Sequence, residues 1–397
     1  MTANGPGPVV TRTGGVTAAG GFRAAGVAAG LKSTGAPDLA LVVNDGPLDG
    51  AAAVFTSNRC KAHPVLWSER VIADGRARAV VLNSGGANCY TGPAGFQNTH
   101  ATAEQTARRL DASPVDILVC STGLIGLLND RDRLLAGVDA AAAALSADGG
   151  PDAAQAILTT DRVPKTAQVT APTGWTVGGM AKGAGMLAPA LATMLVVLTT
   201  DADVDAAGCD AALRAATRVS FDRLDSDGCQ STNDTVALLA SGASGVTPDP
   251  GEFAAVVRAV CQDLALQLLA DAEGADHEIA IEVCHAATED DAVEVGRSVA
   301  RSNLFKAAVF GRDPNWGRVL ASVGTTGAAF DPADLDVAMN GIWVCRQGGP
   351  GEPADQVDLT GRQVSVVIDL KAGDATATVW TNDLTHAYVH ENSAYAS

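Results

Sequence analysis

Short apolar runs separated by longer helical patterns are the sequence feature that most limits the folds open to this chain. Seven runs have the length and composition of buried strands, at residues 39–43, 79–82, 116–120, 194–199, 279–284, 364–370 and 376–380. Five longer segments have helical periodicity, at residues 100–110, 134–145, 206–219, 253–269 and 290–302. Strands and helices do not alternate strictly, so the pattern predicts a mixed α/β fold rather than one doubly wound sheet.

Composition shows that this fold has enough apolar material for a large core. The 397 residues are 47% hydrophobic and 18% charged, which excludes general disorder. The net charge is −18, and no basic stripe runs along the chain, so a nucleic-acid partner is not expected. No long linker divides the chain, although Gly/Pro-rich loops are predicted at residues 149–151, 241–251 and 348–351.

Targeting and metal-binding patterns are weak. The most apolar stretch, residues 186–198, is too short to cross a membrane and contains Pro189, and the first residues lack a signal-peptide core. A cytoplasmic protein without a membrane partner is therefore expected. The eight cysteines form no CxxC pair and the six histidines no HExxH pattern, so we expect free thiols and no metal site.

The most informative segment is the glycine-rich stretch that runs through Lys182 into the apolar run beginning at residue 194. A phosphate-binding loop does not fit, because Ala181 precedes the lysine and Gly183 follows it, where that motif needs Gly and then Ser or Thr. Two interpretations stay open from the pattern alone. One is a glycine-rich turn that feeds a buried strand, with Thr193 an ordinary first residue. The other is a site of self-cleavage.

In the self-cleavage interpretation, the Thr193 hydroxyl attacks the carbonyl of Ala192 and converts the amide into an ester, which water then cleaves. Thr193 becomes a new N-terminus. Its free α-amine, with an ordinary pKa of about 7.7–8.0, serves as the base for its own hydroxyl near neutral pH. One residue then supplies both nucleophile and base.

Residues 182–189 (KGAGMLAP) with 192–195 (ATML) closely resemble the self-cleavage site of the ornithine acetyltransferase, or glutamate N-acetyltransferase, family of arginine biosynthesis. Seven further segments resemble family motifs in the same order: 83–88 (NSGGAN), 120–126 (CSTGLIG), 159–161 (TTD), 231–235 (STNDT), 271–274 (DAEG), 313–318 (DPNWGR) and 391–395 (ENSAY). One departure is residues 127–130 (LLND), where the family often has Leu-Pro. It lies beside the expected oxyanion loop and leaves Thr122 and Gly123 intact.

The resemblance implies a fold and an organisation. The family fold is a layered α-β-β-α arrangement of the self-cleaving ornithine acetyltransferase/DmpA-like type. Cleavage between Ala192 and Thr193 would give an alpha chain, residues 1–192, and a beta chain, residues 193–397. Two of each would assemble as a heterotetramer. The family uses no resident cofactor, although acetyl-CoA serves many members as a second acetyl donor.

The resemblance also implies roles for single residues. Thr193 is the expected nucleophile, which takes the acetyl group of N-acetylornithine and passes it to glutamate. The Thr122 hydroxyl and the Gly123 N–H are expected to stabilise the oxyanion. The expected substrate-binding residues are Thr159, Lys182, Thr193, Glu273, Asn392 and Ser397.

Plainer interpretations accompany each of these roles. Thr122 and Gly123 could form an ordinary turn after a strand. Lys182 could be a solvated charge in a loop, and Glu273 could be a charge at the end of a helix. Asn392 and Ser397 lie near the C-terminus, where chains are often disordered, and the sequence does not distinguish Thr159 from Thr160. Residues 231–235 and 313–318 are expected to form turns that support the site.

Two other functions remain as alternatives. A self-cleaving amidase or aminopeptidase of related fold would hydrolyse amides, but such enzymes use a Ser nucleophile, and the Lys182 and Glu273 pair argues against it. A non-catalytic protein that binds small amino acids would form no acetyl-enzyme.

The self-cleavage hypothesis makes a direct prediction. Purified protein should give two fragments of nearly equal size, residues 1–192 and 193–397, by intact-mass spectrometry. Thr193→Ala should give one uncut chain, because it lacks the attacking hydroxyl. An uncut wild-type protein with full activity would contradict the hypothesis.

Overall fold

Two β-sheets face each other at the centre of the structure, a computed structural model that describes residues 7–186 and 194–394. The first sheet has the strand order β3-β9-β8-β7-β6 and the second the order β1-β2-β4-β5. The first consists of β3 (Ala51–Phe55), β6 (Lys165–Thr170), β7 (Thr176–Lys182), β8 (Leu195–Thr200) and β9 (Thr235–Ala240). The second consists of β1 (Phe22–Val27), β2 (Leu39–Asn44), β4 (Ala79–Asn83) and β5 (Ile117–Ser121).

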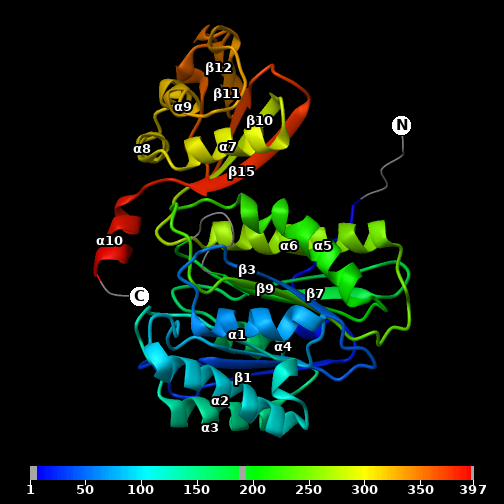
Figure 1. Ribbon diagram of the computed structural model, residues 1–397. Coiled ribbons are helices and arrows are strands. Elements are labelled where there is room, and N and C mark those ends of the chain that lie inside the picture. Colours follow the sequence, from blue (N-terminus) through cyan, green and yellow to red (C-terminus); the bar gives the residue numbers. More distant parts are fainter. Residues whose placement is uncertain (1–6, 187–193, 395–397) are drawn as a thin grey trace.

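Helices cover the outer faces of both sheets, so the layers follow the order α-β-β-α (Figure 1). Helices α5 (Ala206–Arg218) and α6 (Pro250–Ala270) pack on the first sheet, and α2 (Gly92–Leu110) and α3 (Arg131–Ala144) pack on the second. The shorter helices α1 (His63–Val71) and α4 (Gly150–Ala156) lie between the two sheets, where each contacts strands of both (Figure 1). The predicted layered α/β fold is confirmed.

Strand β8 shows how the sequence specifies these layers. Successive side chains of a strand point to opposite faces. Val196 and Leu198 pack with α5 and α6, whereas Leu195 and Val197 pack in the core between the sheets. Every residue of the strand is buried, so its sequence is largely a continuous apolar run rather than an alternation of apolar and polar residues.

The chain from residue 278 to residue 382 builds a second unit with its own core, which the sequence did not predict. Its six-stranded sheet has the order β13-β12-β11-β14-β10-β15. The strands are β10 (Glu278–Ala286), β11 (Asp336–Met339), β12 (Ile342–Arg346), β13 (Gly349–Pro350), β14 (Gln363–Asp369) and β15 (Ala375–Asn382), and the helices are α7 (Glu289–Ala300), α8 (Asn303–Phe310) and α9 (Trp316–Val323). Helix α10 (His386–Ala394) then leads back toward the layered body (Figure 1).

All seven predicted strands and all five predicted helices occur, with ends that differ by a few residues except at α2, which begins eight residues earlier than expected. The prediction of a glycine-rich loop around Lys182 was wrong for its first half, because residues 178–182 belong to β7. A Cβ atom on Gly178 would lie 2.1 Å from the Gly15 carbonyl oxygen, so glycine here permits close packing inside the core. The turn predicted at residues 313–318 ends at residue 315, because α9 begins at Trp316.

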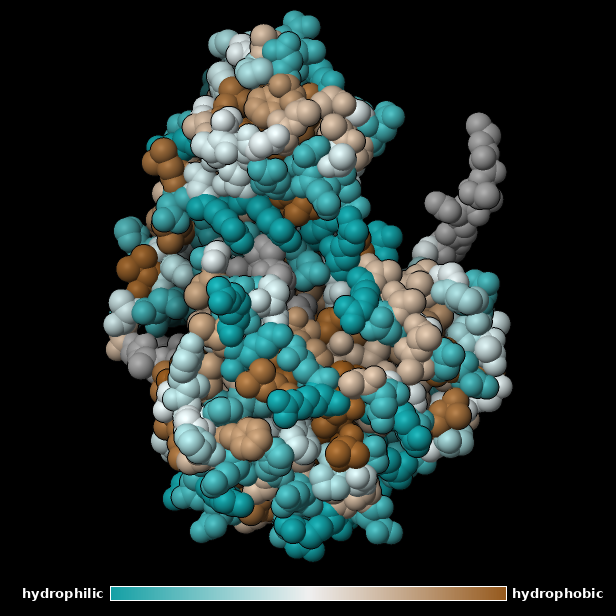
Figure 2. All heavy atoms as spheres, viewed as in Figure 1, coloured by the Kyte–Doolittle hydropathy of each residue, from teal (hydrophilic) through white to brown (hydrophobic). Residues whose placement is uncertain are grey.

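By length and composition alone, helix α6 could cross a membrane, although residues 186–198 were expected to be the most apolar stretch. Half of this α6 segment is buried inside the protein, where it packs on the first sheet, as a core helix does. Hydrophilic side chains predominate on the face shown in Figure 2, with small hydrophobic patches between them. All eight cysteines are free thiols, as expected.

Candidate functional site

Five segments that are distant in sequence meet around one cavity of about 110 Å³. They are the loop after β5, the loop after α4, the end of β7 with the residues that follow it, the turn after α6, and helix α10. The lining residues are Thr122, Gly123, Thr159, Thr160, Lys182, Gly185, Met186, Glu273 and Asn392. The structure thus brings together every predicted site residue that it describes. Ala192, Thr193 and Ser397 lie outside the described residues.

The Thr122 hydroxyl is oriented by a buried ammonium group. Lys182 Nζ donates to Thr122 Oγ1 over 3.0 Å, and the Thr122 N–H donates to the Asn83 carbonyl over 2.9 Å. A hydroxyl that accepts a bond from an ammonium still has its own proton to donate. The Thr122 O–H is therefore free to donate to a further oxygen, as an oxyanion-stabilising group must.

Gly123 has a backbone conformation that few other residues adopt, with φ +123°. A Cβ atom here would lie 2.8 Å from the Gly85 carbonyl oxygen, so only glycine fits this close contact between the two loops. Within the described part of the chain, no acceptor bonds the Gly123 N–H. This N–H and the Thr122 hydroxyl are two adjacent donors at one cavity.

Three asparagine side chains fix the loop that carries these donors. Asn233 Nδ2 donates to the Ser121 carbonyl over 2.8 Å and to the Ala87 carbonyl over 2.6 Å. Asn83 Nδ2 donates to Ser121 Oγ over 2.7 Å, and Asn129 Nδ2 donates to Asn83 Oδ1 over 3.1 Å. Asn129 belongs to residues 127–130, so this segment contributes to the support of the loop that carries Thr122 and Gly123.

A chain of buried charges lies behind the cavity. Lys165 Nζ contacts Asp161 Oδ1 and Asp271 Oδ2, each over 2.7 Å, and the side chains of Lys165 and Asp161 have no exposed surface. Asp161 also accepts the Gly183 N–H over 2.6 Å and the Thr159 N–H over 3.0 Å. This carboxylate thereby connects β6, the end of β7 and the loop after α4. Lys182 is 1% exposed, so the solvated-loop interpretation of this lysine was wrong.

These contacts shift the pKa values of the groups that make them. Burial opposes the ionisation of Asp161, but the charges of Lys182 and Lys165 outweigh burial and lower the pKa of Asp161 to about 2. Burial also lowers the pKa of the Lys182 ammonium, and Asp161 opposes that shift. The Asp161 carboxylate is therefore ionised at neutral pH and is the counter-charge that the buried lysines need.

Glu273 and Asn392 complete the polar wall. Glu273 follows the last turn of α6, as the helix-end interpretation required, and its N–H donates to the Ala184 carbonyl over 2.8 Å. Asn392 lies in α10 rather than in a disordered tail, and its Nδ2 donates to the Tyr388 carbonyl over 3.0 Å. Both Thr159 and Thr160 line the cavity, so the structure does not distinguish which of the two would contact a substrate.

The sequence missed three residues that shape this site, namely Asp161, Asn233 and Asp234. Their segments, 159–161 and 231–235, were noted for their resemblance or as a supporting turn, but no role was given to these side chains. An Asp or Asn between small polar residues is common in exposed turns. Only the fold shows that these three side chains are buried.

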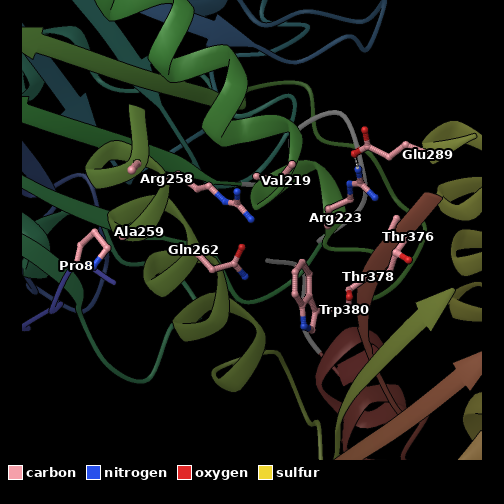
Figure 3. Close-up of a pocket in the computed structure, with 12 residues that line it drawn as sticks. Pro8, Val219, Arg223, Arg258, Ala259, Gln262, Glu289, Thr376, Thr378 and Trp380 are labelled. Carbon is pink, nitrogen blue, oxygen red and sulfur yellow. Dashed lines mark hydrogen bonds and ion pairs between the residues drawn. The ribbon is translucent and has the colours of Figure 1, made fainter. Parts of the chain in front are cut away.

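A larger groove of about 690 Å³ lies elsewhere, between α5, α6 and β15 (Figure 3). Arg223, Arg258, Gln262 and Trp380 line it, and none of the predicted site residues does. In the second unit, Cys284, His285 and Asp369 place three possible metal-binding atoms within 4.8 Å of one another. These three belong to β10 and β14, in a different sheet from the site.

Residues 23–397 match the model of the ArgJ family. The arginine biosynthesis bifunctional protein ArgJ of Streptomyces coelicolor is 65% identical over 96% of this chain and 100% of its own length. The protein of that name from Streptomyces avermitilis is 66% identical with the same coverage. The crystal structure of ornithine acetyltransferase from Mycobacterium tuberculosis, complexed with ornithine, has 54% identity and a TM-score of 0.45 over 47% of this chain and 99% of that chain.

The buried charges predict a measurable loss of stability. Asp161→Asn leaves Lys182 and Lys165 without the carboxylate that faces both, so the free energy of unfolding in urea should fall by about 3–5 kcal/mol at pH 7. Because the folded-state pKa of Asp161 lies below its usual value, its contribution is present above pH 4 and is lost as pH falls toward about 2. The variant should lack this acid-dependent component.

Asp49→Asn is the matched control, because it removes a carboxylate from an exposed pair with Arg76. It should change stability by no more than about 1 kcal/mol. Equal effects of the two substitutions would contradict the importance assigned to Asp161.

Proposed function

The chain belongs to the ArgJ family of arginine-biosynthesis enzymes, and on that premise we propose that it transfers acetyl groups through an ester on Thr193. The protein is an ornithine acetyltransferase, which moves the acetyl group of N-acetylornithine to glutamate. The observation that carries the proposed mechanism is the convergence of Thr122, Gly123, Lys182 and Glu273 on one cavity.

In the first half-reaction, the Thr193 hydroxyl attacks the acetyl carbonyl carbon of N-acetylornithine, and the Thr193 α-amine takes the hydroxyl proton. The carbonyl oxygen becomes an oxyanion, which accepts hydrogen bonds from the Thr122 hydroxyl and the Gly123 N–H. Collapse of this intermediate breaks the C–N bond. The leaving nitrogen takes the proton back from the α-amine, so ornithine departs and the acetyl ester remains on Thr193.

In the second half-reaction, the neutral amine of glutamate attacks the ester carbonyl carbon and the C–O bond to Thr193 breaks. The Thr193 oxygen takes up the proton that the attacking nitrogen loses, so the hydroxyl is restored and N-acetylglutamate leaves. Both substrates carry an α-carboxylate, for which the Lys182 ammonium is the cation closest to the oxyanion donors. Glu273 suits the side-chain ammonium of ornithine. Asn392 has both an acceptor and donors, so it suits either side chain. Thr159 and Ser397 are further proposed contacts.

The nucleophile arises by self-cleavage between Ala192 and Thr193, which gives an alpha chain of residues 1–192 and a beta chain of residues 193–397. Support comes from the contacts between the two parts, because β7 of the first part and β8 of the second are hydrogen-bonded neighbours in one sheet. Separate folding of either part would leave this sheet edge unpaired. We further propose a heterotetramer of two alpha and two beta chains that works in the cytoplasm, without a resident cofactor.

An acetyl-enzyme is the intermediate that tests the mechanism. Incubation with N-acetylornithine in the absence of glutamate should add one acetyl group to the fragment that begins at Thr193, by intact-mass spectrometry. Thr122→Ala should slow formation of this adduct by about 10²- to 10³-fold, because one oxyanion donor is lost. Thr122→Ser keeps the hydroxyl and should retain most of the rate.

Hydrolysis of N-acetylornithine at a rate that does not depend on glutamate would favour the amidase alternative. Binding of the substrate without any adduct on a cleaved wild-type enzyme would contradict the acetyl-enzyme mechanism.

Acetyl-CoA as a second donor is a separate proposal. Supplied with acetyl-CoA and glutamate but no N-acetylornithine, the enzyme should still form N-acetylglutamate, and Thr122→Ala should slow this reaction by the same factor, since both donors would pass through one oxyanion site. If acetyl-CoA gives no product while N-acetylornithine gives full activity, then N-acetylornithine is the donor and acetyl-CoA is not.

A further inference from the structure

Asp234 is a fully buried carboxyl group that the mechanism above does not use. It directly precedes β9, and its Oδ1 accepts the Met194 N–H over 3.0 Å. The next residue, Thr235, donates its N–H to the Met194 carbonyl over 3.2 Å. Both backbone polar groups of Met194 are therefore held by this short segment at the start of β8.

The second oxygen of the carboxyl group lacks a partner. Asp234 Oδ2 is buried, and within the described residues nothing bonds it. A buried polar atom left without a hydrogen bond costs free energy, so such an atom in a native site needs a reason. The charged groups that face Asp234 are Lys182 from β7 and Asp222 from the 3₁₀ turn Phe221–Arg223.

Burial raises the pKa of Asp234 well above its usual value, and the Met194 N–H, Ser231 and Lys182 only partly offset this. The described surroundings thus shift this group toward the neutral acid. A positive charge placed beside Oδ2 would reverse the preference and favour the carboxylate.

Chain connectivity shows where such a charge arises. The nitrogen of Met194 is bonded to the carbonyl carbon of Thr193, so the Thr193 nitrogen lies only three bonds away, within about 3.6 Å of the Met194 nitrogen. In the uncut chain that nitrogen is a neutral amide. After cleavage it is an α-amine, which is an ammonium group when protonated.

We propose that Asp234 is a positioning residue whose Oδ2 binds the α-amine that cleavage creates at Thr193. This inference rests on the proposed function. Cleavage by water gives the new carboxyl terminus at Ala192 and the free amine at Thr193, and the proton of the Asp234 carboxyl group passes to that amine. The result is an ammonium–carboxylate pair that fixes the direction of the amine beside its own hydroxyl.

The test is the pH profile of kcat/KM for acetyl transfer from N-acetylornithine. The acid limb of this profile reports the pKa of the essential base in the free enzyme. A carboxylate beside an amine raises the amine pKa, so Asp234→Asn should move the acid limb to lower pH by about 1 unit or more. The amide oxygen keeps the acceptor for the Met194 N–H, so the variant is expected to fold and to be cut.

Asp201→Asn is the matched control. Asp201 is also buried, and its Oδ1 accepts the N–H of Thr176, the first residue of β7, over 2.7 Å in the same sheet. This variant should leave the acid limb unmoved. An acid limb unchanged in Asp234→Asn, or shifted equally in both variants, would overturn the proposal.

Cleavage of the wild-type chain distinguishes failure of the proposed function from failure of the role of Asp234. A wild-type chain that is never cut contradicts the proposed function, whereas a cut wild-type enzyme with an unmoved acid limb contradicts only the role of Asp234. A folded Asp234→Asn protein that stays uncut would also overturn this role, because the proposal gives the carboxylate no part before the amine exists.

A second measurement avoids the Asp234 variant altogether and so covers the case in which that variant does not fold. Infrared difference spectra should show a protonated, buried carboxylic-acid band in uncut Thr193→Ala that is absent from the cut wild-type enzyme. The same band in both proteins would contradict the proton transfer.

Discussion

The rest of the site depends on the electrostatic interaction of the buried Asp161 carboxylate with Lys165 and Lys182. This carboxylate pairs with Lys165, faces Lys182, and accepts two backbone N–H groups, one from Thr159 in its own loop and one from Gly183 after β7. An ammonium group buried without a counter-charge costs several kcal/mol. Asp161 makes the largest contribution among the carboxyl groups that support the charge of buried Lys182, with smaller ones from Asp234 and Glu273. The position of Lys182 beside the Thr122 hydroxyl thus depends on this buried charge network.

Strand geometry explains why residues so distant in sequence reach this network. Strands β4 and β5 are parallel, so the loops that follow both lie at the same edge of their sheet. Strand β7 ends at that side of the molecule with Lys182, and the antiparallel β8 begins opposite it, with Leu195 paired to Lys182. Close packing of the two sheets, helped by small residues such as Gly178, then brings the two edges together.

Periodicity was sufficient to predict the framework, because a strand buried on both faces and an amphipathic helix each leave a pattern in the sequence. It failed where packing decides the conformation. Residues 178–182 contain two glycines and were predicted as a loop, yet they pair along their whole length within a sheet. The second unit was missed because its core separates from the first in space and no linker marks the boundary. The resemblance named the residues that line the cavity, but neither it nor the pattern predicted that Asp161 and Asn233 are buried, since burial of a short polar side chain depends on contacts from other segments.

The segment of residues 231–235 connects the two halves of the proposed chemistry. Asn233 holds the carbonyl of Ser121, next to the oxyanion donors, while Asp234 and Thr235 hold Met194, next to the proposed nucleophile. One short piece of backbone thus holds both Met194 and the Ser121 carbonyl. The proposed cleavage between Ala192 and Thr193 would break none of these hydrogen bonds. In the proposed mechanism, acetyl transfer needs a hydroxyl beside a carbonyl whose oxygen meets two donors, and this arrangement of loops presents the two donors before substrate binds.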